Sequence, residues 1–210
     1  MNDPTPEFTF RESMSGPLTL GETDPQAGAA KGSSTPFTFH ATISVDDMEA
    51  FIRDPEHAAR LEARISYPPF GEDIPIQHGR FNLFKSGDAP ETRLMTYAMA
   101  FEHQGQSYYL AGTKTIHDDR GPDLWPDTTR LSCVLHEGTD EQGPIVGAGI
   151  LALGLRDVLS IVASMRSSRP GLEGTKAVLR FGRFFLGTLW DVYAPMAHEP
   201  RDPEREPLNP

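Results

Sequence analysis

The sequence predicts a mainly β protein: an antiparallel β-barrel or curved β-sandwich of about seven to nine strands, with a short early helix and two C-terminal helices packed against it. Two observations support this fold class. Up to about Leu153 the apolar residues mostly alternate with polar ones, as in half-buried strands. After Leu153 they recur every three or four residues, as along one face of a helix.

The strands follow from the alternating segments in chain order. Phe37, Phe39 and Ile43 alternate with polar residues, which indicates a strand with one wet face. The same pattern covers the opening FTFRESMSGPLTLG and the ranges Leu61–Tyr67, Gly79–Lys85, Arg93–His103, Ser107–Ile116, Thr129–His136 and Ile145–Leu153. The short polar connection EHQGQS between two of these strands predicts a hairpin.

An early helix is predicted in the segment DDMEAFIRDPEHAARL. Asp46 is followed three residues later by Glu49, which is typical of a helix start, and Met48 and Phe51 share one face. Pro55 limits or restarts this helix. The preceding segment from Gly21 to Pro36 is small and polar, and it predicts a long loop.

Two further helices are predicted after the strands. The first carries apolar residues on one side from Leu155 to Met165. The second, GTKAVLRFGRFFLGTLWDVY, has a broad apolar face and a narrow polar stripe, so we expect it to cover the open end or face of the sheet. Residues 1–194 are therefore interpreted as one domain, and residues 195–210 as a disordered or extended proline-rich tail.

The bulk composition excludes several classes of function. Thirty acidic residues against 19 basic ones, a net charge of −11, disfavour a nucleic-acid partner. The single cysteine, Cys133, excludes an internal disulfide and a multi-thiolate metal site. The sequence has no signal-peptide pattern and no apolar run of about 18 residues, so we expect a cytoplasmic protein.

Motifs for cofactors, metals and catalysis have little support. GAGILA has dinucleotide-binding spacing at Gly147, Gly149 and Ala152, but the apolar run continues through it, which favours a closely packed strand. There is no nucleophile-elbow serine and no paired histidine motif. We therefore predict no catalytic residue, no metal and no cofactor from motifs alone.

The segment GTKTIHDDRGPDLWPDTTRL has two interpretations. Its acidic residues lack calcium-loop spacing, and Asp, Gly and Pro between two strands are typical of a simple turn. Alternatively, Lys114, His117 and Trp125 face the mouth of a cavity, where Trp offers an apolar body with a polar N–H and His titrates near neutral pH.

A wider set of motifs resembles a known family: FRESMSGPLTLGETDPQAGAAKG, GRFNLF, MTYAMAFEHQGQSYYLAGTKTIHDD, DLWPDTTRL and RFGRFFLGTLWDVY. Together, over about Phe8 to Tyr193, they resemble an accessory domain of bacterial multidomain proteins that carry a cholesterol-oxidase-like flavin module of the glucose-methanol-choline (GMC) oxidoreductase class, sometimes with an α/β-hydrolase module. The catalytic and flavin-binding residues of that class map onto none of these positions. The resemblance implies a domain, here standing alone, that is associated with hydrophobic, sterol-like or lipid substrates.

Three hypotheses for function follow. The first is a non-catalytic module that binds a steroid, isoprenoid or fatty acyl chain, or docks a GMC-type enzyme that handles one; its candidate ligand-binding residues are His78, Arg80, Tyr97, Lys114, His117 and Trp125. The second is an enzyme acting on a lipid-like substrate, with His117 and a nearby Asp as acid and base. The third is an interaction domain without a ligand. The basic stripe of the helix Lys176–Tyr193 also allows peripheral membrane contact.

Overall fold

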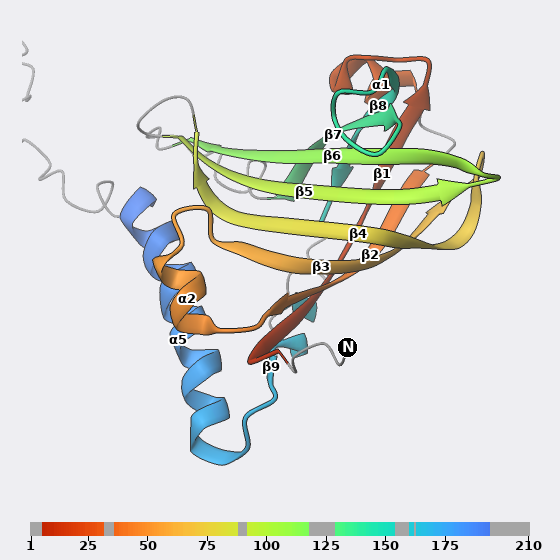
Figure 1. Ribbon diagram of the computed structural model, residues 1–210. Helices are drawn as coiled ribbons and strands as arrows, with labels where there is room; N and C mark the ends of the chain where they lie inside the picture. The colour runs from red at the N-terminus through yellow and green to blue at the C-terminus, as the bar shows by residue number, and fades with distance from the viewer. Residues whose placement is uncertain are drawn as a thin grey trace, which may run out of the picture.

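Eight antiparallel strands close into a barrel in the computed structural model of the chain (Figure 1). The structure describes residues 6–31, 36–87, 92–117, 129–153, 160–161 and 163–193. The strands are β1 (Phe8–Leu20), β2 (Pro36–Val45), β3 (Ala58–Tyr67), β4 (Gly71–Ser86), β5 (Thr92–His103), β6 (Gln106–His117), β7 (Arg130–Glu137) and β8 (Ile145–Ala152), with a short β9 (Arg166–Ser167) beside β1. The helices are α1 (Pro25–Lys31), α2 (Met48–Arg53) and α5 (Gly171–Tyr193).

The barrel closes because β1 pairs with both β2 and β8. Every other neighbouring pair follows the chain order from β2 to β8, so the topology is a simple up-and-down meander. Closure leaves none of the eight strands as a free sheet edge along its whole length. The predicted antiparallel β fold is confirmed, and of the two predicted architectures the structure has the barrel.

Alternation along each strand places one set of side chains inside the barrel. Phe10 lies opposite Ile43 and Met14 opposite Phe39 in the β1–β2 register, and all four are buried. Fully burying a side chain of this size stabilises the fold by about 1.5–3 kcal/mol. The barrel interior is therefore the hydrophobic core predicted from the period-two pattern.

The predicted hairpin joins β5 and β6. His103 pairs with Gln106, so two residues form the turn. These two, Gln104 and Gly105, have φ of 52° and 79°, the left-handed values that a tight turn between twisted strands requires.

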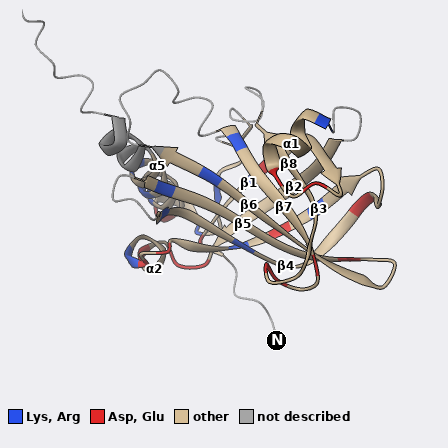
Figure 2. Ribbon diagram, turned by 90° about the horizontal axis from the view of Figure 1, so that it is seen from above, with Lys and Arg blue, Asp and Glu red and all other residues tan. Residues whose placement is uncertain are grey.

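One end of the barrel is covered by α2 and α5 (Figures 1 and 2). Phe181 of α5 is 2% exposed, and its ring centroid lies 4.4 Å from that of Phe8 and 5.5 Å from that of Phe10. Phe51 of α2 adds a third ring at 6.4 Å from Phe181. The prediction that the last helix covers the open end of the sheet is confirmed by these contacts.

The helix α2 is shorter than its predicted segment. Its N-cap is Asp47, whose side chain accepts hydrogen bonds from the N–H groups of Glu49 and Ala50, whereas the predicted cap, Asp46, pairs with Arg60 of β3. The helix ends at Arg53, and β3 begins at Ala58, inside the range predicted as helix or its continuation.

The predicted loop from Gly21 to Pro36 is wrong in part, because it contains α1. Gly28 of α1 approaches β8 so closely that a Cβ at this position would lie 2.0 Å from the Ala148 carbonyl oxygen. Small residues make this approach possible, and the same residues gave the segment its loop-like composition.

The glycines of GAGILA lie inside β8, as predicted. A Cβ at Gly149 would lie 2.2 Å from the Pro17 carbonyl oxygen of β1, so the small residues serve close packing at the β1–β8 seam. Most of the first predicted C-terminal helix and all of residues 195–210 lie outside the described residues.

Candidate functional site

A cluster of three polar side chains lies inside the barrel. Glu12 of β1, Tyr97 of β5 and Lys114 of β6 occupy inward-facing positions of their strands, between apolar neighbours that also face inward. Their exposed fractions are 6%, 2% and 2%. Charged groups at this depth are rare in proteins unless they are paired, so the cluster is the first candidate for a functional site.

The three side chains are joined through the Glu12 carboxylate. Lys114 Nζ lies 3.0 Å from Glu12 Oε1. The Tyr97 hydroxyl donates to the same carboxylate, at 3.0 Å from Oε1 and 2.8 Å from Oε2. Lys114 Nζ also lies 5.2 Å from the centroid of the Tyr97 ring, within the range of a cation–π contact.

Burial keeps two neutral groups protonated, the Tyr97 hydroxyl and the nearby Cys133 thiol. Desolvation, followed by the charge of Glu12, raises the pKa of Tyr97 well above its usual range, so the hydroxyl remains a hydrogen-bond donor at physiological pH. Cys133 of β7 is fully buried, and burial raises the pKa of its thiol while Lys114 opposes that rise. The thiol is therefore protonated, and it behaves as a small apolar group.

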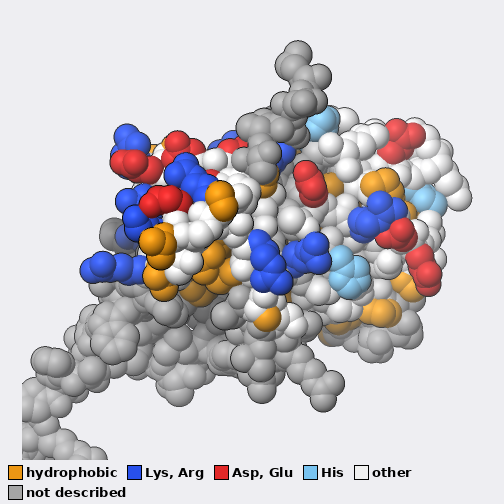
Figure 3. Space-filling model, turned by 90° about the horizontal axis from the view of Figure 1, so that it is seen from below, with side chains coloured by type: hydrophobic (Ala, Val, Ile, Leu, Met, Phe, Trp, Pro, Cys, Tyr) orange, Lys and Arg blue, Asp and Glu red, His pale blue; other side chains and the backbone are white. Residues whose placement is uncertain are grey.

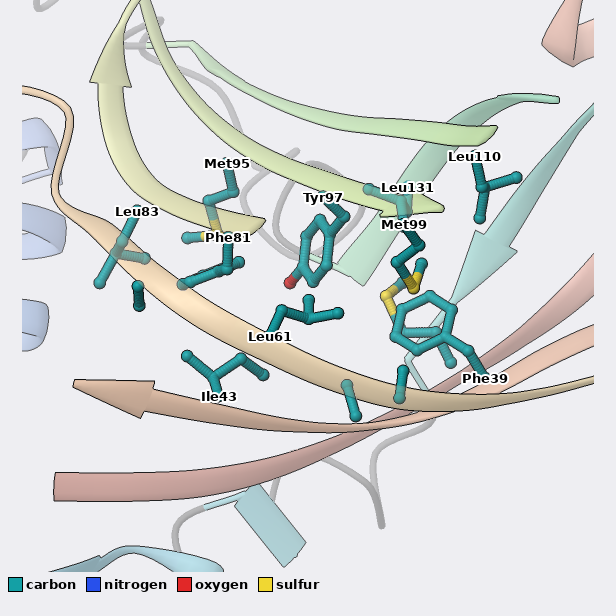
Figure 4. Close-up of a cluster of buried hydrophobic side chains, with 14 of the residues drawn as sticks. Phe39, Ile43, Leu61, Phe81, Leu83, Met95, Tyr97, Met99, Leu110 and Leu131 are labelled. Carbon is teal, nitrogen blue, oxygen red and sulfur yellow. The ribbon is translucent and has the colours of Figure 1, made fainter. Parts of the chain in front are cut away.

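The surroundings of Tyr97 are apolar (Figure 4). The ring centroid of Tyr97 lies 5.0 Å from that of Phe81 and 5.9 Å from that of Phe39. Next to Glu12, the register places Ala41 and then Ala63, two small residues that leave room for the long polar chains. Among the side chains that the structure describes, the cluster is thus a polar point with mainly apolar neighbours.

The cluster lies level with an interruption in the strand pairing of the barrel wall. Within the described residues, β6 pairs with β7 only as far as Thr113, and β1 pairs with β8 only from Ser15 onwards. Lys114 is the next inward-facing residue beyond the first limit, and Met14 and then Glu12 follow beyond the second. Between its pairings with β9 and β8, β1 has no strand partner on that edge among the described residues. There the Arg11 N–H donates to Ser164 Oγ at 2.8 Å instead of to the backbone of a neighbouring strand.

No match to this chain exists among family models, curated proteins or solved structures. What the cluster can do therefore follows from its own chemistry. An ammonium group has three N–H donors, and within the described part of the chain Lys114 Nζ donates one hydrogen bond, to Glu12. The site can therefore offer a donor to a carbonyl, hydroxyl or carboxylate oxygen that enters the lumen.

The six residues predicted to bind a ligand have different places in the fold. Tyr97 and Lys114 meet in the cluster. His78 and Arg80 of β4 are exposed on the outside of the barrel, because the inward position between them belongs to Gly79. His117 ends β6, but its side chain lies outside the described residues, as does Trp125.

Glu12 was not among the predicted residues. The sequence nevertheless indicates this residue. The inward-facing positions of the strand are Phe8, Phe10, Glu12 and Met14, so Glu12 interrupts an otherwise apolar series. An acid in the apolar phase of an alternating strand indicates a buried partner.

Two of the hollows on the outside of the barrel are lined by described residues. The larger, of about 690 Å³, crosses the outer face of β1 to β4, and within it Ser13 Oγ lies 2.8 Å from His40 Nδ1. The second, of about 650 Å³, lies over β6 and β7 beside His136. Among the described residues no group of three or more His, Cys, Asp or Glu is arranged to hold a metal ion, and no helix is long and apolar enough to span a membrane.

Proposed function

We propose that the barrel binds an apolar small molecule of the steroid, isoprenoid or fatty acyl type, and that the polar end of this molecule meets Lys114. The observation that carries the proposal is the buried cluster of Glu12, Tyr97 and Lys114 in an apolar lumen. Pockets for such ligands are mainly apolar, with a few polar groups that fix the orientation of the ligand.

A purely structural role explains the cluster less well. Desolvation of two charges offsets most of their attraction, and an apolar replacement of a buried pair is often neutral or stabilising. Ala41 and Ala63 could be larger apolar residues that fill the same space without a charge. A ligand with a polar end supplies a reason to keep the ammonium group in the lumen.

Adaptation of the barrel interior to a ligand is proposed to come from its methionine side chains. Met95 and Met99 flank Tyr97 on β5, and all three side chains are buried (Figure 4). Methionine is unbranched, so it changes rotamer and repacks at low cost. Entry is proposed at the end covered by α5, which contacts the barrel mainly through side chains such as Phe181.

The test is native mass spectrometry of the purified protein, with extraction and identification of co-purifying compounds, followed by thermal-shift measurements with sterols, isoprenoids and acyl chains. We expect at least one compound of these types to bind and raise the melting temperature. Lys114→Met removes the donor and should weaken binding, whereas Lys85→Met, at an exposed ion pair with Glu56, should leave it unchanged. Binding of none of these compounds, or equal binding by Lys114→Met, contradicts the proposal.

The other roles remain proposals of lower rank. Docking of a GMC-type flavin oxidoreductase is supported by the family resemblance of the motifs. An enzyme with His117 and a nearby Asp as acid and base is tested by turnover of a bound compound and its loss in His117→Gln. A cytoplasmic location is supported by Cys133, a free and buried thiol in a chain with one cysteine.

A further inference from the structure

The helix α5 presents a second face away from the barrel. Ala177 and Phe181 are buried against the barrel end, and on the opposite side lie Leu172, Lys176, Leu179 and Arg183. At about 100° per residue these four fall within about 60° of one another, so they form one straight stripe along the helix. We refer to these four residues as the outer stripe.

The outer stripe combines exposed leucines with cations. Leu172 is 79% exposed and Leu179 is 65% exposed, whereas the other exposed large hydrophobic residues of the described chain, Leu20 and Ile145, are each 41% exposed. Viewed from below, basic, acidic and apolar side chains share the surface at the end of the molecule that carries α5 (Figure 3). Exposed apolar groups of this kind indicate an interaction site.

The sequence segment that contains most of α5 has a charge opposite to that of the whole chain. From Arg166 to Phe185 there are five basic residues and one acidic residue, in a chain of net charge −11. Glu173 pairs with Lys176 at 2.7 Å. Arg180 and Arg183 form no ion pair with the side chains that the structure describes, so their charge is available to an anionic partner.

We propose that the outer stripe of α5, with Arg180 beside it, docks the protein onto an anionic membrane surface. Leucine side chains enter the headgroup region while arginine and lysine meet lipid phosphates, as in other interfacial helices. A protein partner fits less well, because a stable interface buries roughly 800 Å² on each side around an apolar core, far more than two leucines provide.

Docking of this face would bring the covered end of the barrel next to the bilayer. Phe8, Phe10 and Phe181 meet there, so an apolar molecule that leaves the bilayer would reach the lumen without crossing water. This role in ligand transfer rests on the proposed function, but docking itself does not.

The test is flotation of the full-length protein with vesicles of pure phosphatidylcholine and with vesicles of equal parts phosphatidylcholine and phosphatidylglycerol. We expect binding to the anionic vesicles alone, and release by high salt. Each cation near an anionic surface changes binding roughly five-fold. Arg180→Glu/Arg183→Glu should therefore weaken binding by at least about 25-fold.

Matched variants separate the stripe from general effects of charge and apolar surface. Leu172→Ser/Leu179→Ser should weaken binding by roughly ten-fold, whereas Leu20→Ser/Ile145→Ser should not. Arg80→Glu/Arg130→Glu, two exposed cations on barrel strands, serves as the charge control. Circular dichroism establishes that each variant is folded.

Three results would overturn the inference: no binding to anionic vesicles, binding that the outer-stripe variants retain, or sedimentation showing that the stripe joins two copies of the chain instead. The thermal shift by an apolar compound should persist in Arg180→Glu/Arg183→Glu. Loss of vesicle binding with an intact thermal shift concerns only the docking of α5 and leaves ligand binding in the barrel unaffected. Intact vesicle binding without any thermal shift contradicts only the proposed ligand binding.

Discussion

The buried pair of Glu12 and Lys114 makes a prediction about stability that a double-mutant cycle can measure. The changes are Glu12→Gln, Lys114→Met and the two together. Each single change removes one charge and leaves its partner buried, because the two side chains are only 3% and 2% exposed. The double change removes both charges and leaves a neutral amide beside Tyr97.

The expected magnitude follows from the 3.0 Å separation of Lys114 Nζ and Glu12 Oε1. At an effective dielectric constant of about 20, the attraction is about 5 kcal/mol. Breaking such a pair by removing one partner typically costs 3–5 kcal/mol, roughly, because one charge stays desolvated. We expect the double variant to lose less stability than the sum of the two single variants, with a coupling energy of about 2–4 kcal/mol.

The assay is urea unfolding followed by circular dichroism. The matched control is the exposed pair of Lys31 and Glu22, whose atoms lie 2.6 Å apart but whose side chains are 63% and 23% exposed. There Lys31→Met and Glu22→Gln should couple by less than about 1 kcal/mol. If the buried pair couples no more strongly than this control, the conclusion that its charges are desolvated and mutually dependent is wrong.

Three further predictions concern the seam, the covered end and the cluster. Gly149→Ala should destabilise the protein much more than Gly147→Ala in urea unfolding. A Cβ at Gly149 would lie 2.2 Å from a carbonyl oxygen, whereas a Cβ at Gly147 would lie 3.2 Å from its nearest side chain. Equal losses of stability would contradict the close packing of β1 and β8. Phe181→Ala should cost about 3–5 kcal/mol and the exposed Leu179→Ala about 0.5 kcal/mol or less, and the reverse order would show that α5 packs through its other face. Tyr97 has a raised pKa, so its contribution to stability is complete below the unfolded value of about 10 and is lost as pH rises toward the folded value. Tyr97→Phe should therefore lose less stability than the wild type between about pH 9 and 11, and an identical loss would rule out this role for Tyr97.

The strands could be predicted from the sequence because a barrel gives each of them one dry and one wet face. Phe37 to Val45 shows this alternation, and β2 lies almost where the pattern predicts it. Closure could not be predicted in the same way. It depends on pairs such as Leu18 with Gly149, which are far apart in sequence and which no local pattern identifies. For this reason the sequence left barrel and sandwich open.

The candidate site was only partly predictable for a related reason. Tyr97 and Lys114 lie on adjacent, hairpin-connected strands, so the sequence places them close together. Glu12 reaches them from β1 across the lumen, and that contact exists only once the barrel is closed. His78 and Arg80 were predicted as ligand-binding residues because of their polar side chains. The alternation of side chains along β4 points both of them outward.

The most direct test of ligand binding is a crystal structure of the protein with the apolar compound that raises its melting temperature most. We expect the compound inside the barrel, beside Tyr97, with one of its oxygen atoms within about 3.2 Å of Lys114 Nζ. A compound bound in the outer hollow beside Ser13 and His40, with the lumen still filled by its own side chains, would contradict the proposed function.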